Sequence, residues 1–275
     1  MNFILGGGVA GLIAAFYNQS FKIISPELGG QPALGPRLIQ KHPKNHKLLY
    51  DLGFRKFKVK TAKIGFFYKG KLHDTCPTSL RMEYYEKTRQ VTCAKIPKSI
   101  MSDDKKTIDY YDVIWEDLIK ALVDKVKNQW IKAKVNNITE KGIIFDNKYH
   151  EYKKLISTIP APIFFKLKKQ EEENLILADY RKHTFSAVDK SFGLASSPFD
   201  GGNYDYIYFP DKKIEISRAT KINEDSWLYE KTGKHRGMQV LPRVQIKHNA
   251  DFGKTNNIKF IGRYAQWKHG VNFNK

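Results

Sequence analysis

The stretch FILGGGVAGL, residues 3–12, decides the fold of this 275-residue chain. A short apolar run ends at Leu5, a turn of three glycines follows directly, and a second apolar run begins at Val9. The first run predicts a buried strand, and residues 9–17 predict a helix packed on a sheet. Residues 21–24 predict a second strand, parallel to the first because a helix connects them. The chain therefore opens as strand, glycine turn, helix and strand.

The glycine turn also predicts a ligand. Gly6, Gly8 and Gly11 satisfy the pattern G-x-G-x-x-G in the strand-to-helix context that the pattern requires. Gly6 permits the tight turn, Gly8 lets backbone amides approach a pyrophosphate, and Gly11 allows close packing of helix and strand. The pyrophosphate then rests on the amides at the positive end of the helix dipole. The alternative is a glycine turn that only packs the helix on the sheet.

The end of the second predicted strand departs from the usual dinucleotide pattern. An acidic residue is expected there, where it holds a ribose hydroxyl. In this chain the strand ends at Ser25, and Glu27 follows two residues later. Two alternatives stay open, because either Glu27 reaches back to the ribose or Ser25 makes a weaker contact in its place.

The remaining sequence predicts two interleaved subdomains. Residues 54–100 change to short aromatic and basic stretches, which are typical of strands and loops in a different subdomain. Asp112 is predicted to cap a helix that runs to about Asn128 and has one apolar face. Short strands are predicted within 131–159, a hairpin within 204–217 around PDKK, and one last buried strand from residue 258. The predicted apolar face of the helix consists of Trp115, Leu118, Ile119, Leu122 and Val126.

The net charge of +20 invites a nucleic-acid interpretation, because a basic surface releases counterions from phosphate backbones. Of the 48 basic residues, nine are Arg and 39 are Lys, and the lysines are scattered through every segment. An AT-rich genome favours lysine codons. We therefore favour composition bias, and not a nucleic-acid partner, as the explanation of the high positive charge. Attraction of an anionic substrate is the functional alternative.

Other classes of site and compartment are weakly indicated. Cys76 and Cys93 are the only cysteines, so neither a disulfide framework nor a thiolate metal site is predicted, and a cytoplasmic protein is expected. His42 and His46 have helical ligand spacing, but Pro43 between them argues against a helix there, and no metal is expected. Glycines interrupt the longest apolar run well before the ~20 residues of a bilayer span, so no membrane partner is expected.

Three further stretches carry a family resemblance: Gly29-Gly30-Gln31, KLISTIPAP at 154–162 and IKFIGRYAQWKHGVN at 258–272. Together they resemble the flavin-dependent amine oxidoreductase superfamily, and within it proteins related to UDP-galactopyranose mutase. The resemblance implies FAD as the cofactor, with its pyrophosphate bracketed by the glycine turn and the Gly29-Gly30 pair. It also implies that Gly262 and Arg263 approach the ribityl chain and the flavin ring. Further cofactor contacts are implied at Val9, Ala10, Gln31, Val135 and Val271.

A fourth stretch, YFPDKKIEISRAT at 208–220, is similar to the mutase segment in which a strand pair ends in an arginine facing the flavin. The resemblance implies that Arg218 acts in catalysis and that Arg218 and Arg263 bind substrate. A guanidinium suits this role because its planar fork binds phosphate with two hydrogen bonds. The alternative is that Arg218 is an exposed strand residue paired with Glu215 or Glu224.

Two residues of the last stretch are candidates for the same site. His269 lies in the segment that the resemblance places at the flavin, where an imidazole could move a proton. A histidine hydrogen-bonded to backbone is the alternative. Trp267 either stacks on the ring system of the substrate or cofactor, or fills the core.

The expected fold class is α/β, with a discontinuous Rossmann-like FAD-binding domain and an inserted mixed α+β substrate domain. The FAD-binding domain is predicted to comprise residues 1–53, 112–162 and 255–275, and the substrate domain residues 54–111 and 163–254. The expected function is FAD-dependent oxidation of a small polar or anionic substrate by hydride transfer. The alternatives are a mutase acting on a nucleotide sugar, and a non-catalytic nucleotide-binding or basic nucleic-acid-associated protein.

Overall fold

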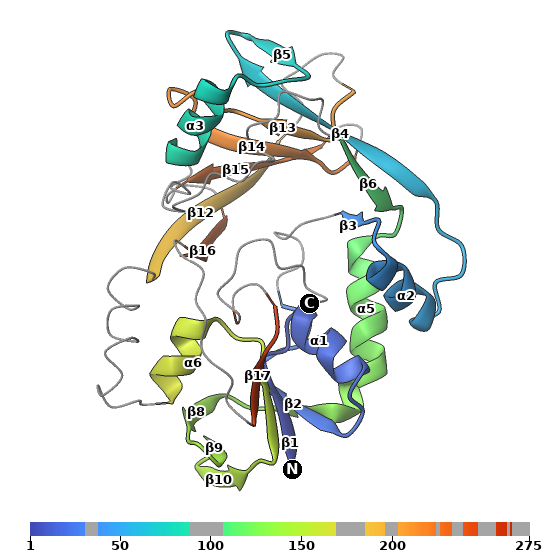
Figure 1. Cartoon of the computed structure of the whole chain (residues 1–275), viewed down its shortest axis with the longest axis vertical. Helices are drawn as coiled ribbons and strands as arrows, with labels where there is room; N and C mark the ends of the chain where they lie inside the picture. The colour runs from blue at the N-terminus through green and yellow to red at the C-terminus, as the bar shows by residue number, and fades with distance from the viewer. Residues whose placement is uncertain are drawn as a thin grey trace. The chain divides into compact units, whose positions relative to one another are not determined.

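The computed structural model describes residues 1–30, 38–87, 107–168, 185–195, 203–223, 226–232, 239–246, 257–262 and 265 (Figure 1). The chain divides into two compact units. Unit 1 comprises residues 1–57, 112–185 and 248–275, and unit 2 comprises residues 58–111 and 186–247. Each unit is therefore built from segments that are far apart in the sequence.

Unit 1 contains a five-stranded sheet in the order β17-β11-β1-β2-β7, and all of its pairings are parallel. The predicted pairing of the first two strands is confirmed, since Asn2 to Leu5 lie in parallel register with Phe21 to Ile24. The last strand is only partly buried, at the edge of the sheet, whereas a fully buried strand was expected. The strands are β1 (Asn2–Leu5), β2 (Phe21–Ser25), β7 (Trp130–Lys132), β11 (Lys154–Ser157) and β17 (Ile258–Phe260).

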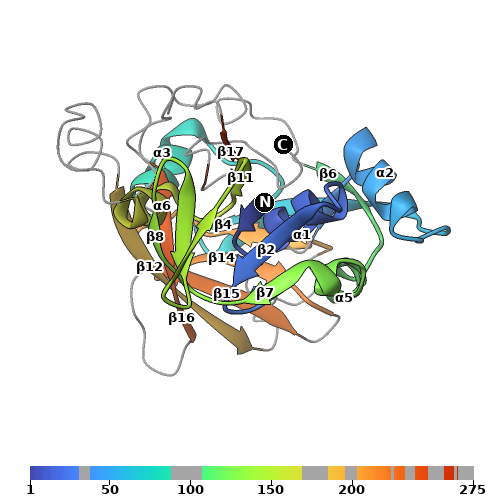
Figure 2. The same ribbon diagram turned by 90° about the horizontal axis from the view of Figure 1, so that it is seen from below.

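Two helices pack together beside β2 in unit 1 (Figure 2). The first, α1 (Val9–Phe16), connects β1 to β2, and the second, α5 (Trp115–Val126), buries all five residues of its predicted apolar face. The prediction that Asp112 caps this helix is wrong, because Ile114 occupies the N-cap without a side-chain hydrogen bond. Glu116 and Asp117 in the first turn offset the helix dipole instead.

The other elements of unit 1 are short. An antiparallel sheet in the order β10-β9-β8 lies within 131–159, and of its three strands only β9 matches a predicted one. No helix within the described ranges has the length and apolar character needed to cross a bilayer. The elements are β3 (Ile39–Gln40), α2 (Pro43–Asp51), η2 (Lys127–Gln129), β8 (Val135–Ile138), β9 (Gly142–Phe145), β10 (Lys148–Glu151) and α6 (Ala161–Leu167).

Unit 2 is built on a sheet in the order β16-β12-β15-β14-β13-β4-β6, with β5 paired to β4. The predicted hairpin is confirmed as the antiparallel pair β13–β14, although β14 continues beyond Ser217 to Lys221. The helix α3 (Thr78–Lys87) was not predicted. The strands are β4 (Val59–Tyr68), β5 (Lys71–His73), β6 (Thr107–Tyr111), β12 (Phe185–Ala195), β13 (Tyr206–Tyr208), β14 (Ile216–Lys221), β15 (Trp227–Thr232) and β16 (Gln239–Ile246).

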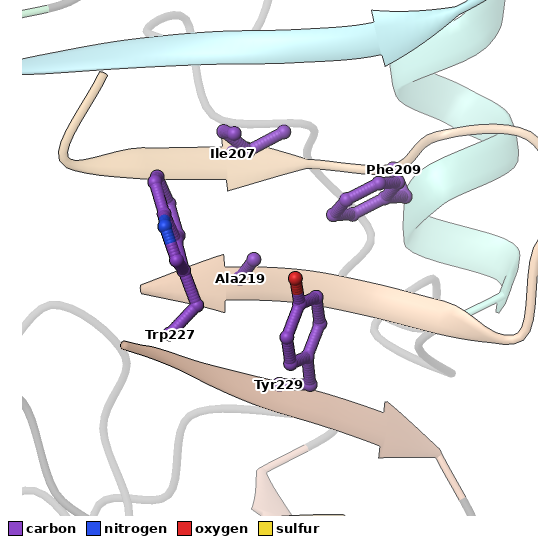
Figure 3. Close-up of a cluster of buried hydrophobic side chains, with 5 residues drawn as sticks. All are labelled: Ile207, Phe209, Ala219, Trp227 and Tyr229. Carbon is purple, nitrogen blue, oxygen red and sulfur yellow. The ribbon is translucent and has the colours of Figure 1, made fainter. Parts of the chain in front are cut away.

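One face of the unit 2 sheet carries a buried hydrophobic cluster. Figure 3 shows its five side chains, which come from β13, β14, β15 and the residue after β13. Successive side chains of a strand point to opposite faces, so the neighbours of this cluster project from the other face. Those neighbours include Arg218 and Glu230, together with Tyr208, which packs against a second buried cluster around Phe66. The cluster consists of Ile207, Phe209, Ala219, Trp227 and Tyr229.

Candidate functional site

The glycine turn between β1 and α1 is held against the end of β11. Gly6 has a φ of +103°, which favours glycine, and its amide donates to the Ile24 carbonyl at 3.1 Å. A Cβ on Gly6 would lie 2.6 Å from Oγ1 of Thr158, whose hydroxyl donates to the Leu5 carbonyl at 2.8 Å. The tight turn predicted for Gly6 is therefore enforced by its own backbone and by the strand beside it.

Two more glycines of the turn are required by close contacts within the protein. A Cβ on Gly11 would lie 1.9 Å from the Gly6 carbonyl oxygen, so the first turn of α1 packs directly on the glycine turn. A Cβ on Gly7 would lie 2.2 Å from the Glu27 carbonyl oxygen. Sequence reasoning gave Gly7 no role, because its contact is with a segment 20 residues later.

Gly8 differs from its neighbours, because nothing in the described protein explains why it lacks a side chain. Its φ of −73° and ψ of −179° suit any residue, and a Cβ there would meet no atom of the described residues within 4 Å. Gly8 is the N-cap of α1 and makes no side-chain capping bond, and the first turn holds no acidic residue. The first-turn amides of a helix have no acceptors within the helix. Gly8 thus leaves open space at the positive end of α1.

Two other glycine segments lie against this helix end. Gly29 donates its amide to the Gly7 carbonyl at 2.8 Å, and a Cβ on Gly30 would lie 3.8 Å from Cα of Gly8. A Cβ on Gly262 would lie 3.1 Å from Cβ of Ala10. Gly29, Gly30 and Gly262 all have positive φ, at 89°, 66° and 90°. The structure therefore brings three sequence-predicted segments together around the start of α1.

Ser25 and Glu27 have different surroundings at the end of β2. The Ser25 side chain is buried, and its hydroxyl donates to the Glu27 carbonyl at 2.6 Å. A hydroxyl has one hydrogen, so this bond commits it to the turn. Glu27 is exposed, and its carboxylate is available to a ligand. Ser25 therefore shapes the turn, whereas the Glu27 carboxylate stays exposed.

The other predicted cofactor residues fall into two groups. Val135 is the first residue of β8, two residues after Ala133, whose amide donates to the Ser25 carbonyl at 3.2 Å. Val9 and Ala10 form the first turn of α1. The residues predicted to contact cofactor or substrate that lie outside the described part of the chain are Gln31, Arg263, Trp267, His269 and Val271.

Arg218 lies in a row of four aligned side chains on the face of the unit 2 sheet opposite the cluster of Figure 3. Strand register places Tyr208 opposite both Phe66 and Arg218, and places Glu230 on the other side of Arg218. Nη2 of Arg218 donates to Oε2 of Glu230 at 2.7 Å, and the side chains are 32% and 7% exposed. Pairing with Glu215 is not found, because Glu215 accepts from Lys231 instead. Glu224, the other partner considered, lies outside the described residues.

The surroundings of Arg218 suit an anion. Burial lowers the pKa of its guanidinium, but Glu230 and the hydroxyls of three tyrosines outweigh burial and raise it. Nε of Arg218 is buried and has no hydrogen-bond partner among the described residues. Burial also raises the pKa of Tyr206 to about 12, so this hydroxyl keeps its proton at neutral pH. The three tyrosines are Tyr84, Tyr206 and Tyr208, none of which sequence reasoning singled out.

The histidine pair considered for metal binding has structural roles. His42 is the N-cap of α2, where its Nδ1 accepts from the Lys44 amide at 3.2 Å. The helix begins at Pro43, contrary to expectation, because proline is tolerated in the first helical turn. The His46 ring lies 5.4 Å from the Phe57 ring. In the described segments, no group of three His, Cys, Asp or Glu side chains could hold a metal ion.

The fold is similar to that of several solved structures. A reduced UDP-galactopyranose mutase superposes with a TM-score of 0.67 at 13% identity, covering 99% of this chain and 92% of that one. A protein described as a putative protoporphyrinogen oxidase from Exiguobacterium sp. has a TM-score of 0.62 at 12% identity, with coverages of 99% and 95%. Putrescine oxidase bound to putrescine has a TM-score of 0.54 at 12% identity, with coverages of 85% and 75%. No family model and no curated protein matches the sequence. At these identities the likeness shows a shared fold.

Proposed function

We propose that this protein binds FAD in unit 1 and oxidises a small polar or anionic substrate by hydride transfer to the flavin. The observation that carries the proposal is the open space at Gly8. The other glycines of the turn are needed for packing, whereas Gly8 leaves room for something that the described chain does not provide. A pyrophosphate fits, because the uncapped amides and the dipole of α1 favour an anion there.

The residues around α1 suit the rest of such a dinucleotide. Gly30 and Gly262 keep the backbone close to Gly8 and Ala10 without side chains that would fill the space. The Glu27 carboxylate is placed to accept hydrogen bonds from ribose hydroxyls. Val135 is proposed to line the adenosine side. Similarity in fold to an oxidase bound to putrescine and to UDP-galactopyranose mutase supports a flavoenzyme.

Unit 2 is proposed to bind the substrate through Arg218. FAD supplies a hydride acceptor when bound, and the protein contributes binding and orientation. Arg218 presents a permanent positive charge beside the Tyr206 hydroxyl, which remains protonated, a set that binds carboxylate or phosphate. Glu230 holds the guanidinium from one side and leaves Nε for another acceptor. Arg263, Trp267 and His269 are proposed to act in the same reaction, as anion binder, stacking partner and proton carrier.

The visible absorption spectrum of the purified protein, before and after addition of FAD, tests the cofactor. Bound flavin is expected to give the absorption of blue light that is typical of oxidised flavin, and this absorption should persist after gel filtration. Protein that stays colourless after incubation with FAD would contradict the proposal and favour a nucleotide-binding or basic nucleic-acid-associated role. Binding to random duplex DNA that weakens steeply with added salt would favour the latter.

Anaerobic mixing of the FAD-loaded protein with amines, amino acids and nucleotide sugars tests the reaction. Bleaching of the flavin by one compound is expected, and Arg218→Gln should retain flavin but lose the bleaching. Lys231→Gln is the matched control, because it removes a cation from β15 that pairs with Glu215 instead. Bleaching by the Arg218→Gln variant at the wild-type rate would remove Arg218 from the site. Rearrangement of a nucleotide sugar without net oxidation would indicate the mutase reaction.

A further inference from the structure

The ammonium group of Lys87 is surrounded by backbone carbonyls of the β13–β14 connection. It donates to the carbonyl oxygens of Phe209, Asp211 and Ile216, at 2.8, 2.9 and 2.6 Å. Lysine has three N–H donors, so these contacts use all of them. Lys87 is the last residue of α3, and the group is partly buried. One side chain thus ties the end of α3 to both strands of the hairpin.

One of these carbonyls lies directly before an irregularity in β14. The register of β14 against β15 shifts between Ile216 and Arg218, which leaves Ser217 as the extra residue of a bulge. The Ser217 hydroxyl donates to the Glu230 carbonyl at 2.8 Å, and the Phe209 amide donates to the Ser217 carbonyl at 3.1 Å. A bulge redirects the side chains that follow it. The residue that follows this bulge is Arg218.

The same helix also contributes to the surroundings of Arg218. Tyr84 lies one turn before Lys87 on the same side of α3, since residues three apart are neighbours on a helix. Its ring meets the Tyr208 ring edge-on, with the centroids 5.3 Å apart at an interplanar angle of 85°. Tyr84 is one of the three tyrosines that act on the Arg218 guanidinium. The position of α3 therefore determines where Tyr84 lies, and α3 also contacts the residue directly before the bulge.

We infer that Lys87 is a positioning residue of the Arg218 site, which clamps α3 to the β13–β14 connection and so fixes the direction of Arg218 and the place of Tyr84. The inference rests on the proposed function in one respect, namely that Arg218 binds an anion. A second contact between the same elements, the exposed ion pair of Lys212 with Glu86, cannot replace the clamp, because exposed pairs contribute little.

Titration calorimetry with inorganic pyrophosphate tests the inference, using wild type, Lys87→Met, Arg218→Gln and the double variant. Replacing Arg218 should not affect pyrophosphate bound at the glycine turn. The difference between the wild-type and Arg218→Gln titrations therefore gives the binding that depends on Arg218. Lys87→Met is expected to weaken this Arg218-dependent affinity about tenfold. In the double variant, Lys87→Met should have no further effect on pyrophosphate binding. Lys212→Met, which removes a cation from the same connection, should bind as wild type does.

A conservative variant and a second measurement guard against a variant that fails to fold. Lys87→Arg keeps the charge and the donors and should recover most of the affinity. Hydrogen exchange should show faster exchange in 209–218 for Lys87→Met and near-normal exchange for Lys87→Arg. Three results would each overturn the inference. Lys87→Met could lower the pyrophosphate affinity equally with and without Arg218, or it could leave the affinity at the wild-type value. The wild type could also show no binding that depends on Arg218. FAD binding, read from the absorption spectrum, decides the proposed function separately.

Discussion

Ser25 and Glu27, the two candidates for the proposed ribose contact, differ in burial and in hydrogen bonding. Ser25 is buried and shapes the turn through its bond to the Glu27 carbonyl, while Glu27 remains exposed to a ligand. Replacing Ser25 should therefore affect stability, whereas replacing Glu27 should affect FAD binding.

Glu27→Gln is expected to leave the free energy of unfolding unchanged and to weaken FAD binding about tenfold or more, the loss of a charged hydrogen bond. Ser25→Ala is expected to lower the free energy of unfolding by about 1 kcal/mol, since it removes one buried hydrogen bond. Denaturant unfolding and fluorescence titration with FAD measure the two quantities. Equal FAD affinities for Glu27→Gln and wild type would return the ribose contact to Ser25.

Lys87 predicts a specific pH dependence. Burial lowers its pKa from 10.5 to about 8, and the charge of Asp211 opposes this only in part. Between pH 8 and 10.5 the unfolded chain binds this proton more fully than the folded one, so stability from this group rises with pH. The difference in free energy of unfolding between wild type and Lys87→Met should be constant below pH 8 and increase toward pH 10.5. Urea titrations across this range measure it, and a difference that falls with pH would contradict the assignment.

The connection between β1 and α1 shows how one turn serves packing and binding together. Gly6, Gly7 and Gly11 allow close contacts with Thr158, Glu27 and the turn itself. Of these four glycines, only Gly8 would place an added Cβ more than 4 Å from every atom of the described residues. Substitutions at Gly11 and Gly8 should therefore separate loss of packing from loss of binding.

Gly11→Ala is expected to lower the free energy of unfolding by about 1–3 kcal/mol, because its methyl group would overlap the Gly6 carbonyl oxygen. Gly8→Ala should cost about 0.5–1 kcal/mol, because alanine is a poorer N-cap than glycine, and should add no steric overlap. Thermal unfolding of both variants without cofactor makes the comparison. Similar losses at the two positions would mean that Gly8 also packs against the protein.

Local patterns predicted the parallel β1-α1-β2 unit, the buried face of α5 and the β13–β14 hairpin. These depend on the spacing of apolar residues and on glycine, which act over a few positions. Tyr208 and Glu230 lie close to Arg218 in the sequence, but their pairing with it depends on the register of β14, which shifts at the bulge before Arg218, and no local pattern marked that bulge. Helix α3 was missed because polar and aromatic residues alternate along TSLRMEYYEK without one apolar face.

The molecule as a whole combines two units that are each interleaved in the sequence. The candidate cofactor residues that are described lie in unit 1, and the Arg218 row lies in unit 2. A charge of +20 spread over both units favours association with anions in general, and it does not single out a partner. The proposal of a pyrophosphate at the start of α1 therefore depends on geometry and not on net charge.

Titration of wild type and Gly8→Asp with FAD, together with thermal unfolding of both without FAD, tests that geometry most directly. Aspartate is a good N-cap and suits the helix dipole, so the variant should be at least as stable as wild type. Its carboxylate would occupy the space proposed for the pyrophosphate, and like charges in contact should weaken FAD binding about a hundredfold or more. Unchanged FAD affinity in a folded Gly8→Asp protein, or no FAD binding by the wild type, would contradict the account.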